Sequence, residues 1–244
     1  MSPIIAIFRR ELAGYFVTPV AYVFLVIFVA LIGGLTFYIG GFYEQGQADL
    51  GSFFGLHPWL YAFLVPALAM RLWAEERDTG TIELLLTLPI TTTQAVIGKF
   101  LAAWAFTVIA LLLTAPMWWT VNYLGDPDNG VILAAYIGSA LMAGGFLAIG
   151  SFVSALTRSQ VVAFIIGFLI CFVLLMAGYP LVLDVFSGWA PRAVVEAVEA
   201  MSFLTHFESI SRGVIDLRDL VYFIGMIAFF LFANVTVIET KKAE

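Results

Sequence analysis

The sequence contains little charge and almost no cysteine. Only 11% of its 244 residues are Asp, Glu, Lys or Arg, whereas 62% are apolar, and the mean hydropathy is +1.03. This composition excludes an ordinary soluble domain and predicts an integral membrane protein. The net charge of −6 and the scattered basic residues argue against a nucleic-acid partner. The single cysteine, Cys171, lies in an apolar run, so an intramolecular disulfide and a cysteine-based metal site are excluded.

Sequence motifs for hydrolysis and nucleotide binding are also missing. H-E-x-x-H and G-x-S-x-G do not occur, and Gly98-Lys99-Phe100 lacks the earlier glycine and the hydroxyl group of a P-loop. We therefore expect no catalytic residue, metal or cofactor on this chain. His57 and His206 both lie near expected outer ends of spans, which favours interfacial residues that anchor helix ends over a metal site.

Long apolar runs predict an all-α, polytopic membrane protein with six transmembrane helices. The expected spans are residues 20–43, 57–73, 99–123, 131–156, 161–183 and 217–238. Their interiors lack Asp, Glu, Lys and Arg, the groups on which proton-driven and sodium-driven carriers depend, so an ion-coupled carrier is disfavoured. Residues 1–18 have apolar side chains at helical spacing, which predicts an interfacial helix ahead of the first span.

Basic residues divide unequally between the two sides that six spans define. A cytoplasmic N-terminus places Arg192, Arg212 and Arg218 outside and eight residues inside, namely Arg9, Arg10, Arg71, Arg77, Lys99, Arg158, Lys241 and Lys242. The positive-inside rule favours this orientation. Both termini and the loop of residues 74–98 are then cytoplasmic, and residues 184–216 lie on the outer face.

The loop of residues 74–98 is predicted to contain a short helix. Thr79-Gly80-Thr81 indicates a turn, and Ile82 to Leu88 form about two apolar helical turns that end before Pro89. A helix with so many leucines is not stable alone in water and is too short to cross a bilayer. We therefore expect it to lie at the membrane surface and to dock on another protein.

Two further helix starts are indicated by capping-box patterns. Thr91-x-x-Gln94 precedes the third span, and Thr205-x-x-Glu208 precedes a short helix that is expected to end at Gly213. Together with a weakly amphipathic piece after Pro191, this predicts two short helices on the outer face.

The run from Glu75 to Ile90, continued by Gly98-Lys99-Phe100, resembles the signature between the second and third spans of ABC-2 type permeases. These proteins are the membrane subunits of one class of ATP-binding cassette transporters. The segments Phe203–Glu208 and Ser211–Asp219, with Phe8–Leu12, are similar to the branch that includes the gliding-motility permease and the permease of the nitrous-oxide reductase maturation system. The similarity covers essentially the whole chain.

The resemblance implies a non-enzymatic permease in the bacterial cytoplasmic (inner) membrane. A separate cytoplasmic ABC ATPase would bind ATP and Mg and drive export or mechanical work. The resemblance also implies a homodimer, or a heterodimer with a paralogue, within membrane lipids, and an auxiliary membrane protein with an extracytoplasmic domain. The residues implied for coupling to the ATPase are Glu75, Glu76, Arg77, Thr81, Ile82, Glu83, Leu84, Leu85, Leu86 and Leu88. Those implied for the external gate are Phe203, Thr205, His206, Phe207, Glu208, Arg212 and Gly213.

Several alternatives stay open. An intramembrane enzyme acting on lipid would need polar catalytic groups at one depth, and a scaffold that only anchors other proteins would not require the capped cytoplasmic helix. The charges from Glu75 to Asp78 also suit a solvated loop flank. Ala140, Gly144 and Ala148 recur at every fourth position, which suits close helix packing either within the subunit or at a dimer seam.

Overall fold

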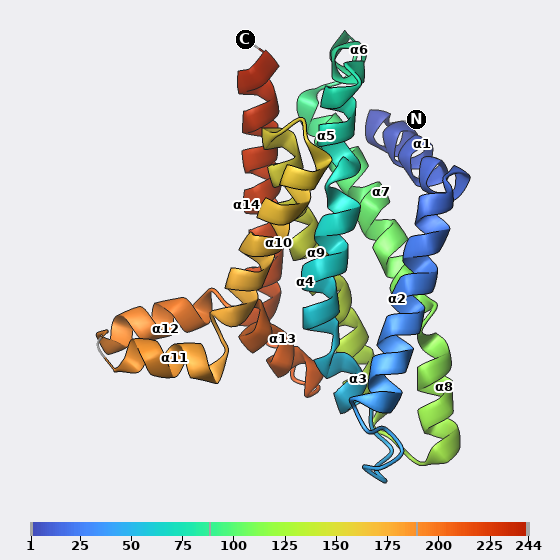
Figure 1. Ribbon diagram of the computed structural model, residues 1–244, viewed down its shortest axis with the longest axis vertical. Helices are drawn as coiled ribbons and strands as arrows, with labels where there is room; N and C mark the ends of the chain where they lie inside the picture. The colour runs from blue at the N-terminus through green and yellow to red at the C-terminus, as the bar shows by residue number, and fades with distance from the viewer. Residues whose placement is uncertain (1, 88, 189, 243–244) are drawn as a thin grey trace.

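The computed structural model describes residues 2–87, 89–188 and 190–242, and within these ranges the chain is helical and has no strand. The helices, labelled in Figure 1, are α1 Pro3–Val17, α2 Pro19–Tyr38, α3 Gly51–Gly55, α4 His57–Ala69, α5 Arg71–Asp78, α6 Thr81–Thr87, α7 Thr92–Leu112, α8 Ala115–Leu124, α9 Asn129–Leu156, α10 Gln160–Met176, α11 Pro180–Ser187, α12 Arg192–Ala200, α13 Phe203–Ser211 and α14 Leu217–Lys242. This agrees with the predicted all-α class.

The long helices form one elongated bundle (Figure 1). Both termini and α6 lie at one end of it, which we call the terminal end. The opposite end, with α3 and the loop between α8 and α9, is the distal end, and α11 and α12 form a hairpin that projects sideways from the bundle. The sequence predicted that both termini and the 74–98 loop lie on the cytoplasmic side; in the structure both termini and α6 lie at the same end, while the cytoplasmic side stays a prediction.

Four helical stretches in the described part of the chain are long and apolar enough to cross a membrane. They are residues 19–38, 92–124, 129–156 and 217–241. Helix α10 is apolar but shorter, and the expected second span is divided at Met70 into α4 and α5. The lengths support a multi-pass membrane protein, while the count of six spans stays a prediction.

Several helices end before the predicted ends of their spans. Helix α2 ends at Tyr38 rather than near residue 43, because the chain turns at Gly41, whose φ of +56° suits glycine. Helix α10 ends at Met176 rather than at residue 183, because Pro180 cannot continue a helix and instead starts α11. The two short helices expected after Pro191 are present as α12 and α13, and α11 is an additional short helix that begins within the expected fifth span. Pro116 lies in the first turn of α8, directly after the break between α7 and α8.

Side-chain caps fix the starts of the helices. The capping box of Thr91 and Gln94 is confirmed: the Gln94 N–H donates to Thr91 Oγ1 at 3.2 Å, and the Thr91 N–H donates to Gln94 Oε1 at 3.1 Å. The box predicted at Thr205 is wrong. Helix α13 starts earlier because Ser202 Oγ accepts hydrogen bonds from the backbone N–H groups of Leu204 and Thr205. The expected stop at Gly213 is confirmed by its φ of +88°.

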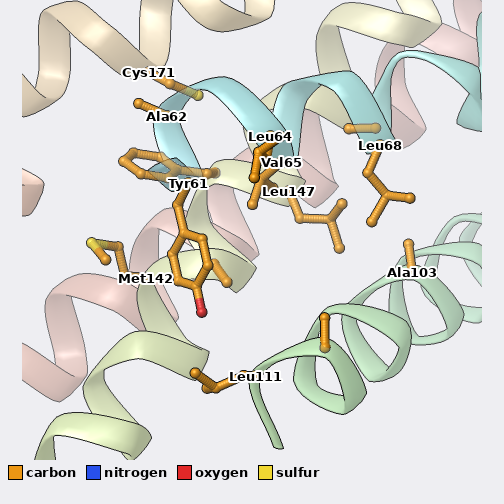
Figure 2. Packing of buried hydrophobic residues seen from close by; sticks show 14 of the residues in the cluster. Tyr61, Ala62, Leu64, Val65, Leu68, Ala103, Leu111, Met142, Leu147 and Cys171 are labelled. Atoms are coloured by element: carbon orange, nitrogen blue, oxygen red, sulfur yellow. The ribbon is translucent and has the colours of Figure 1, made fainter. Parts of the chain in front are cut away.

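Helix α9 lies at the centre of the fold and contacts α4, α5, α7, α10, α13 and α14. Figure 2 shows Tyr61, Val65 and Leu68 of α4 among the buried side chains that pack beside Met142 and Leu147 of α9. Most of α9 is buried, whereas little of α2 and α14 is buried and both helices carry exposed apolar side chains. Exposed apolar side chains on α2 and α14 are expected in an integral membrane protein, where lipid or another apolar chain covers them.

Small residues of α9 let the neighbouring helices approach closely. A Cβ atom added to Gly150 would lie 2.5 Å from Ala69 Cβ, so α4 and α9 touch there. Gly144 faces the side chains of Trp104 and Ile227, and Ala148 is fully buried. The interpretation of this stripe as packing within the chain is therefore confirmed.

Candidate functional site

The helix pair α5–α6 is attached to the centre of the bundle at the point where α4 is interrupted. Ser154 Oγ, from α9, accepts hydrogen bonds from the backbone N–H groups of Trp73 at 3.1 Å and Ala74 at 3.0 Å. The same hydroxyl donates to the Met70 carbonyl oxygen at 2.7 Å. A side chain inserted at such a point is a known cause of helix kinks. Ser154 thus satisfies free N–H groups at the start of α5 and joins α5 to α9.

Two further buried polar groups extend this contact toward α14. Trp73 Nε1 donates to Ser151 Oγ at 3.2 Å, and Asn234 Nδ2 donates to the same oxygen at 2.7 Å. Both serine hydroxyls therefore take part in hydrogen bonds between helices. This arrangement explains the polar residues at this depth as packing contacts and gives no support to the intramembrane-enzyme alternative.

A buried lysine joins α5 to α1 and α7. Lys99, near the start of α7, is only 3% exposed. Its Nζ lies 2.7 Å from Glu76 Oε1 of α5 and 3.2 Å from Glu11 Oε1 of α1, and 5.5 Å from the centroid of the Trp73 ring. A buried charge is costly unless it is paired. The two carboxylates compensate Lys99 and hold three helices at one point.

The electrostatic surroundings of Glu11 reflect this pairing. Burial raises the pKa of the Glu11 carboxyl group, but the charges and hydrogen bonds of Lys99 and Arg10 lower it by more. The resulting pKa lies below the ordinary value for glutamate. Glu11 is therefore ionised at neutral pH and remains a partner of Lys99.

The predicted short helix is present as α6. Gly80, with a φ of +72°, makes the expected turn between α5 and α6. Ile82 is half-buried against the core, whereas Thr81 and Glu83 are exposed at the terminal end. Leu84, Leu85 and Leu86 belong to α6, but their side chains lie outside the described part of the structure, as does the whole of Leu88.

The acidic flank before α6 has a mixed environment. Glu75 forms an ion pair with Arg71 at 3.1 Å near the surface, and Asp78 is exposed. Glu76 is largely buried against Lys99, and Arg77 is half-buried. The interpretation of this segment as a solvated loop flank therefore holds for Asp78 but not for Glu76, which packs against Lys99.

The residues expected at the external gate divide into two groups. Phe203 and Phe207 are buried, and the Phe203 ring stacks on Phe146 of α9 with 4.5 Å between centroids. Glu208 and Arg212 are exposed and form an ion pair at 3.3 Å. Thr205, which is half-buried, lies in the first turn of α13. Helix α13 is thus amphipathic, with its aromatic face against the bundle.

His206 and Asp219 form a buried pair between α13 and α14. His206 Nδ1 lies 2.6 Å from Asp219 Oδ1, and Nε2 lies 3.2 Å from the Ala200 carbonyl oxygen. The ring stacks on Tyr222 with 3.9 Å between centroids. Both ring nitrogens lie within hydrogen-bond distance of an oxygen atom. In the described part of the chain no three His, Cys, Asp or Glu side chains are placed to hold a metal.

Both histidines differ from the expected interfacial residues. His206 has the partner Asp219, which the sequence analysis did not identify, because the two residues come from different elements. His57 is fully buried, with its Nδ1 3.0 Å from the Phe53 carbonyl oxygen and its ring stacked on Phe54. Neighbouring aromatic side chains from α3 and α4 explain the burial of His57.

Sequence reasoning missed the roles of Glu11, Trp73 and Ser154. The position of Lys99 at the start of a long apolar helix was one signal in the sequence, because a buried lysine needs an anionic partner. The sequence does not reveal which carboxylate that partner is. Nothing in the sequence distinguishes Ser154 from the other serines of α9.

The chain was compared with known protein families and proteins. A family model described as ABC-2 family transporter protein matches residues 5–214. No curated protein matches the chain.

Proposed function

The chain belongs to the ABC-2 family of transporter proteins and is a membrane-embedded permease subunit, and we propose that a separate cytoplasmic ATPase drives it by docking on α6. In this proposal the terminal end of the bundle faces the cytoplasm, in accord with the excess of basic residues there. The membrane is the bacterial inner membrane. ATP and Mg bind to the ATPase and not to this chain.

The observation that carries the proposal is the attachment of α5 and α6 to the spans. Helix α6 is short and lies at the terminal end, and α5 is joined to α9 through Ser154 and to α1 and α7 through Lys99. A force applied to α6 therefore reaches three other helices through buried polar contacts. An isolated surface loop would transmit no such force.

Mechanistically, the ATPase shifts an equilibrium between two states of the permease. ATP binding changes the equilibrium only by the amount by which the closed ATPase prefers one state over the other. In the proposal, residues Thr81 to Leu88 form the contact with the ATPase, and Glu75, Glu76 and Arg77 form the polar flank that precedes it. The amphipathic helix α13, with Phe203, His206 and Phe207 on its buried face, forms the gate on the outer side.

The proposals on oligomeric state, auxiliary partner and activity rest on the resemblance of the sequence motifs to those of ABC-2 type permeases. A second copy of the chain, or a paralogue, completes the transport path, and an auxiliary membrane protein with an extracytoplasmic domain joins the complex. The proposed activity is export, or mechanical work on that auxiliary protein. Membership of the gliding-motility and nitrous-oxide reductase branch is proposed on the residues 203–208 and 211–219.

The first test is to purify the protein from its native membrane in a mild detergent. Mass spectrometry is expected to find a cassette ATPase in a stoichiometric amount, and any further membrane protein that co-purifies identifies the auxiliary partner. A protein that is purified alone, and stays alone when candidate ATPases are added, would contradict the proposal.

A matched pair of variants tests the role of α6. Glu83→Lys changes an exposed charge on α6, and Glu196→Lys makes the same change on α12 of the hairpin. We expect Glu83→Lys to lower the ATP hydrolysis of the complex or its co-purification, and Glu196→Lys to leave both unchanged. Equal effects of the two substitutions would contradict docking at α6.

A further inference from the structure

A basic cavity lies beside α6 and is separate from the contacts that hold α5. Its volume is about 710 Å³, and its walls come from α5, α6, the turn between α9 and α10, and the last part of α14. The basic residues in its lining are Arg77, Arg158 and Lys241, and the acidic ones are Asp78 and Glu83. A cavity of this size is large enough to hold a small polar group.

Two guanidinium groups in this cavity have no counter-ion among the described residues. Among residues 2–87, 89–188 and 190–242, neither Arg77 nor Arg158 has a carboxylate within ion-pair distance, and Arg77 Nε is buried without a hydrogen-bond acceptor. Burial lowers the pKa of Arg77, and the neighbouring positive charge of Arg158 lowers it further. Two like charges held together, one of them with a buried unpaired donor, make a site that an anion would stabilise.

The position of the cavity indicates where the anion comes from. Arg158 lies between two exposed apolar residues, Leu156 and Val161, at the ends of two apolar helices. Lys241 follows the apolar part of α14, and its Nζ donates to the Leu156 carbonyl oxygen at 2.6 Å. The basic residues thus lie where the apolar surface of the bundle ends. In a membrane this is the depth of the lipid phosphates.

We propose that this cavity binds the phosphodiester headgroup of a membrane phospholipid, with Arg77 and Arg158 as its principal ligands. Guanidinium groups match phosphate oxygens in geometry as well as charge. The exposed carboxylates of Asp78 and Glu83 lie in the same lining and can accept hydrogen bonds from the hydroxyl groups of a headgroup such as glycerol. A bound phosphodiester would connect α5 with the turn between α9 and α10 and so stabilise the position of α6.

The proposed lipid site does not depend on docking of an ATPase. Lipid binding is a property of the isolated chain, whereas ATPase docking requires the second protein, so the two proposals fail separately. An acidic surface of the ATPase is the competing occupant of the cavity, and the experiment distinguishes it from a lipid.

The test uses the full chain, stripped of lipid in detergent and titrated with phosphatidylglycerol during native mass spectrometry. Diacylglycerol with the same acyl chains is the phosphate-free probe, and inorganic phosphate is the competitor. The variants are R77Q/R158Q and, because Arg77 is half-buried, also R158Q alone on the exposed turn. R192Q, at an exposed arginine on α12, is the matched control.

We expect the unchanged chain and R192Q to bind phosphatidylglycerol, and R77Q/R158Q to bind it at least about ten-fold more weakly, with R158Q between them. Diacylglycerol should bind to none of them at this site. Equal phosphatidylglycerol binding in all variants would overturn the proposal. Displacement by inorganic phosphate would also overturn it in favour of a free anion, and loss of a co-purifying ATPase with lipid binding unchanged would assign the cavity to that protein.

Discussion

The terminal and distal ends of the bundle both attach short helices through a buried contact between a basic and an acidic side chain, but the residues and the number of partners differ. At the terminal end, Lys99 is held by two carboxylates. At the distal end, His206 pairs with Asp219 and stacks on Tyr222, inside a cluster of aromatic rings. Lys99 therefore has two acidic partners, whereas His206 has one. The two attachments should therefore respond differently when a partner is removed.

The largest effect is expected for Lys99→Ala, because it leaves Glu11 and Glu76 without their common cation. Breaking a buried ion pair by removing one partner costs about 3–5 kcal/mol. Denaturant titration of the protein in detergent micelles measures the loss in free energy of unfolding. Arg10→Ala, which removes an exposed partner of Glu11, is the control and should cost less than about 1 kcal/mol. Similar losses in the two variants would contradict the structural role of Lys99.

A smaller effect is expected for Asp219→Ala at the distal end. Without Asp219, His206 loses its partner at Nδ1 but keeps the Ala200 carbonyl oxygen at Nε2, so the expected loss is about 1–3 kcal/mol, that of a buried hydrogen bond. The same titration measures it, with Glu208→Ala as the control at an exposed ion pair. A loss as large as that of Lys99→Ala would show that the two ends do not differ as described.

The smallest of the three effects is expected for Ser154→Ala. The change leaves the N–H groups of Trp73 and Ala74 without their acceptor, which costs about 1–2 kcal/mol, as loss of a helix cap does. Hydrogen exchange should become faster at these two amides and remain unchanged at the distal end. Ser209→Ala on α13 is the control. Unchanged exchange at Trp73 and Ala74 would contradict the capping contact.

Much of the fold follows from local patterns in the sequence. The apolar runs predicted most of the long helices, the capping box at Thr91 predicted the start of α7, and the turn at Gly80 predicted the boundary between α5 and α6. Such features depend on neighbours in the chain. The early end of α10 and the start of α13 at Phe203 were missed, because competing signals, Pro180 and Ser202, lie close to the predicted boundaries.

The candidate site was less predictable, because its contacts join distant parts of the chain. The sequence identified Glu75 and Glu76 as a polar flank but could not separate the exposed glutamate from the buried one. The hydrogen bonds of Ser154 and the pairing of Lys99 with Glu11 arise only when separate helices pack together. The partner of His206 was hidden for the same reason.

The connection between α1 and α2 at the terminal end is very short. Only Thr18, in an extended conformation, separates α1 from α2, and Pro19 begins α2 at once. A connection of one residue restricts the orientation of α1 relative to α2. Because Glu11 and Glu76 share Lys99, we expect a displacement of α5 to rotate α1 about this connection. The first long helix would then move with α1, by a route that does not pass through the centre of the bundle.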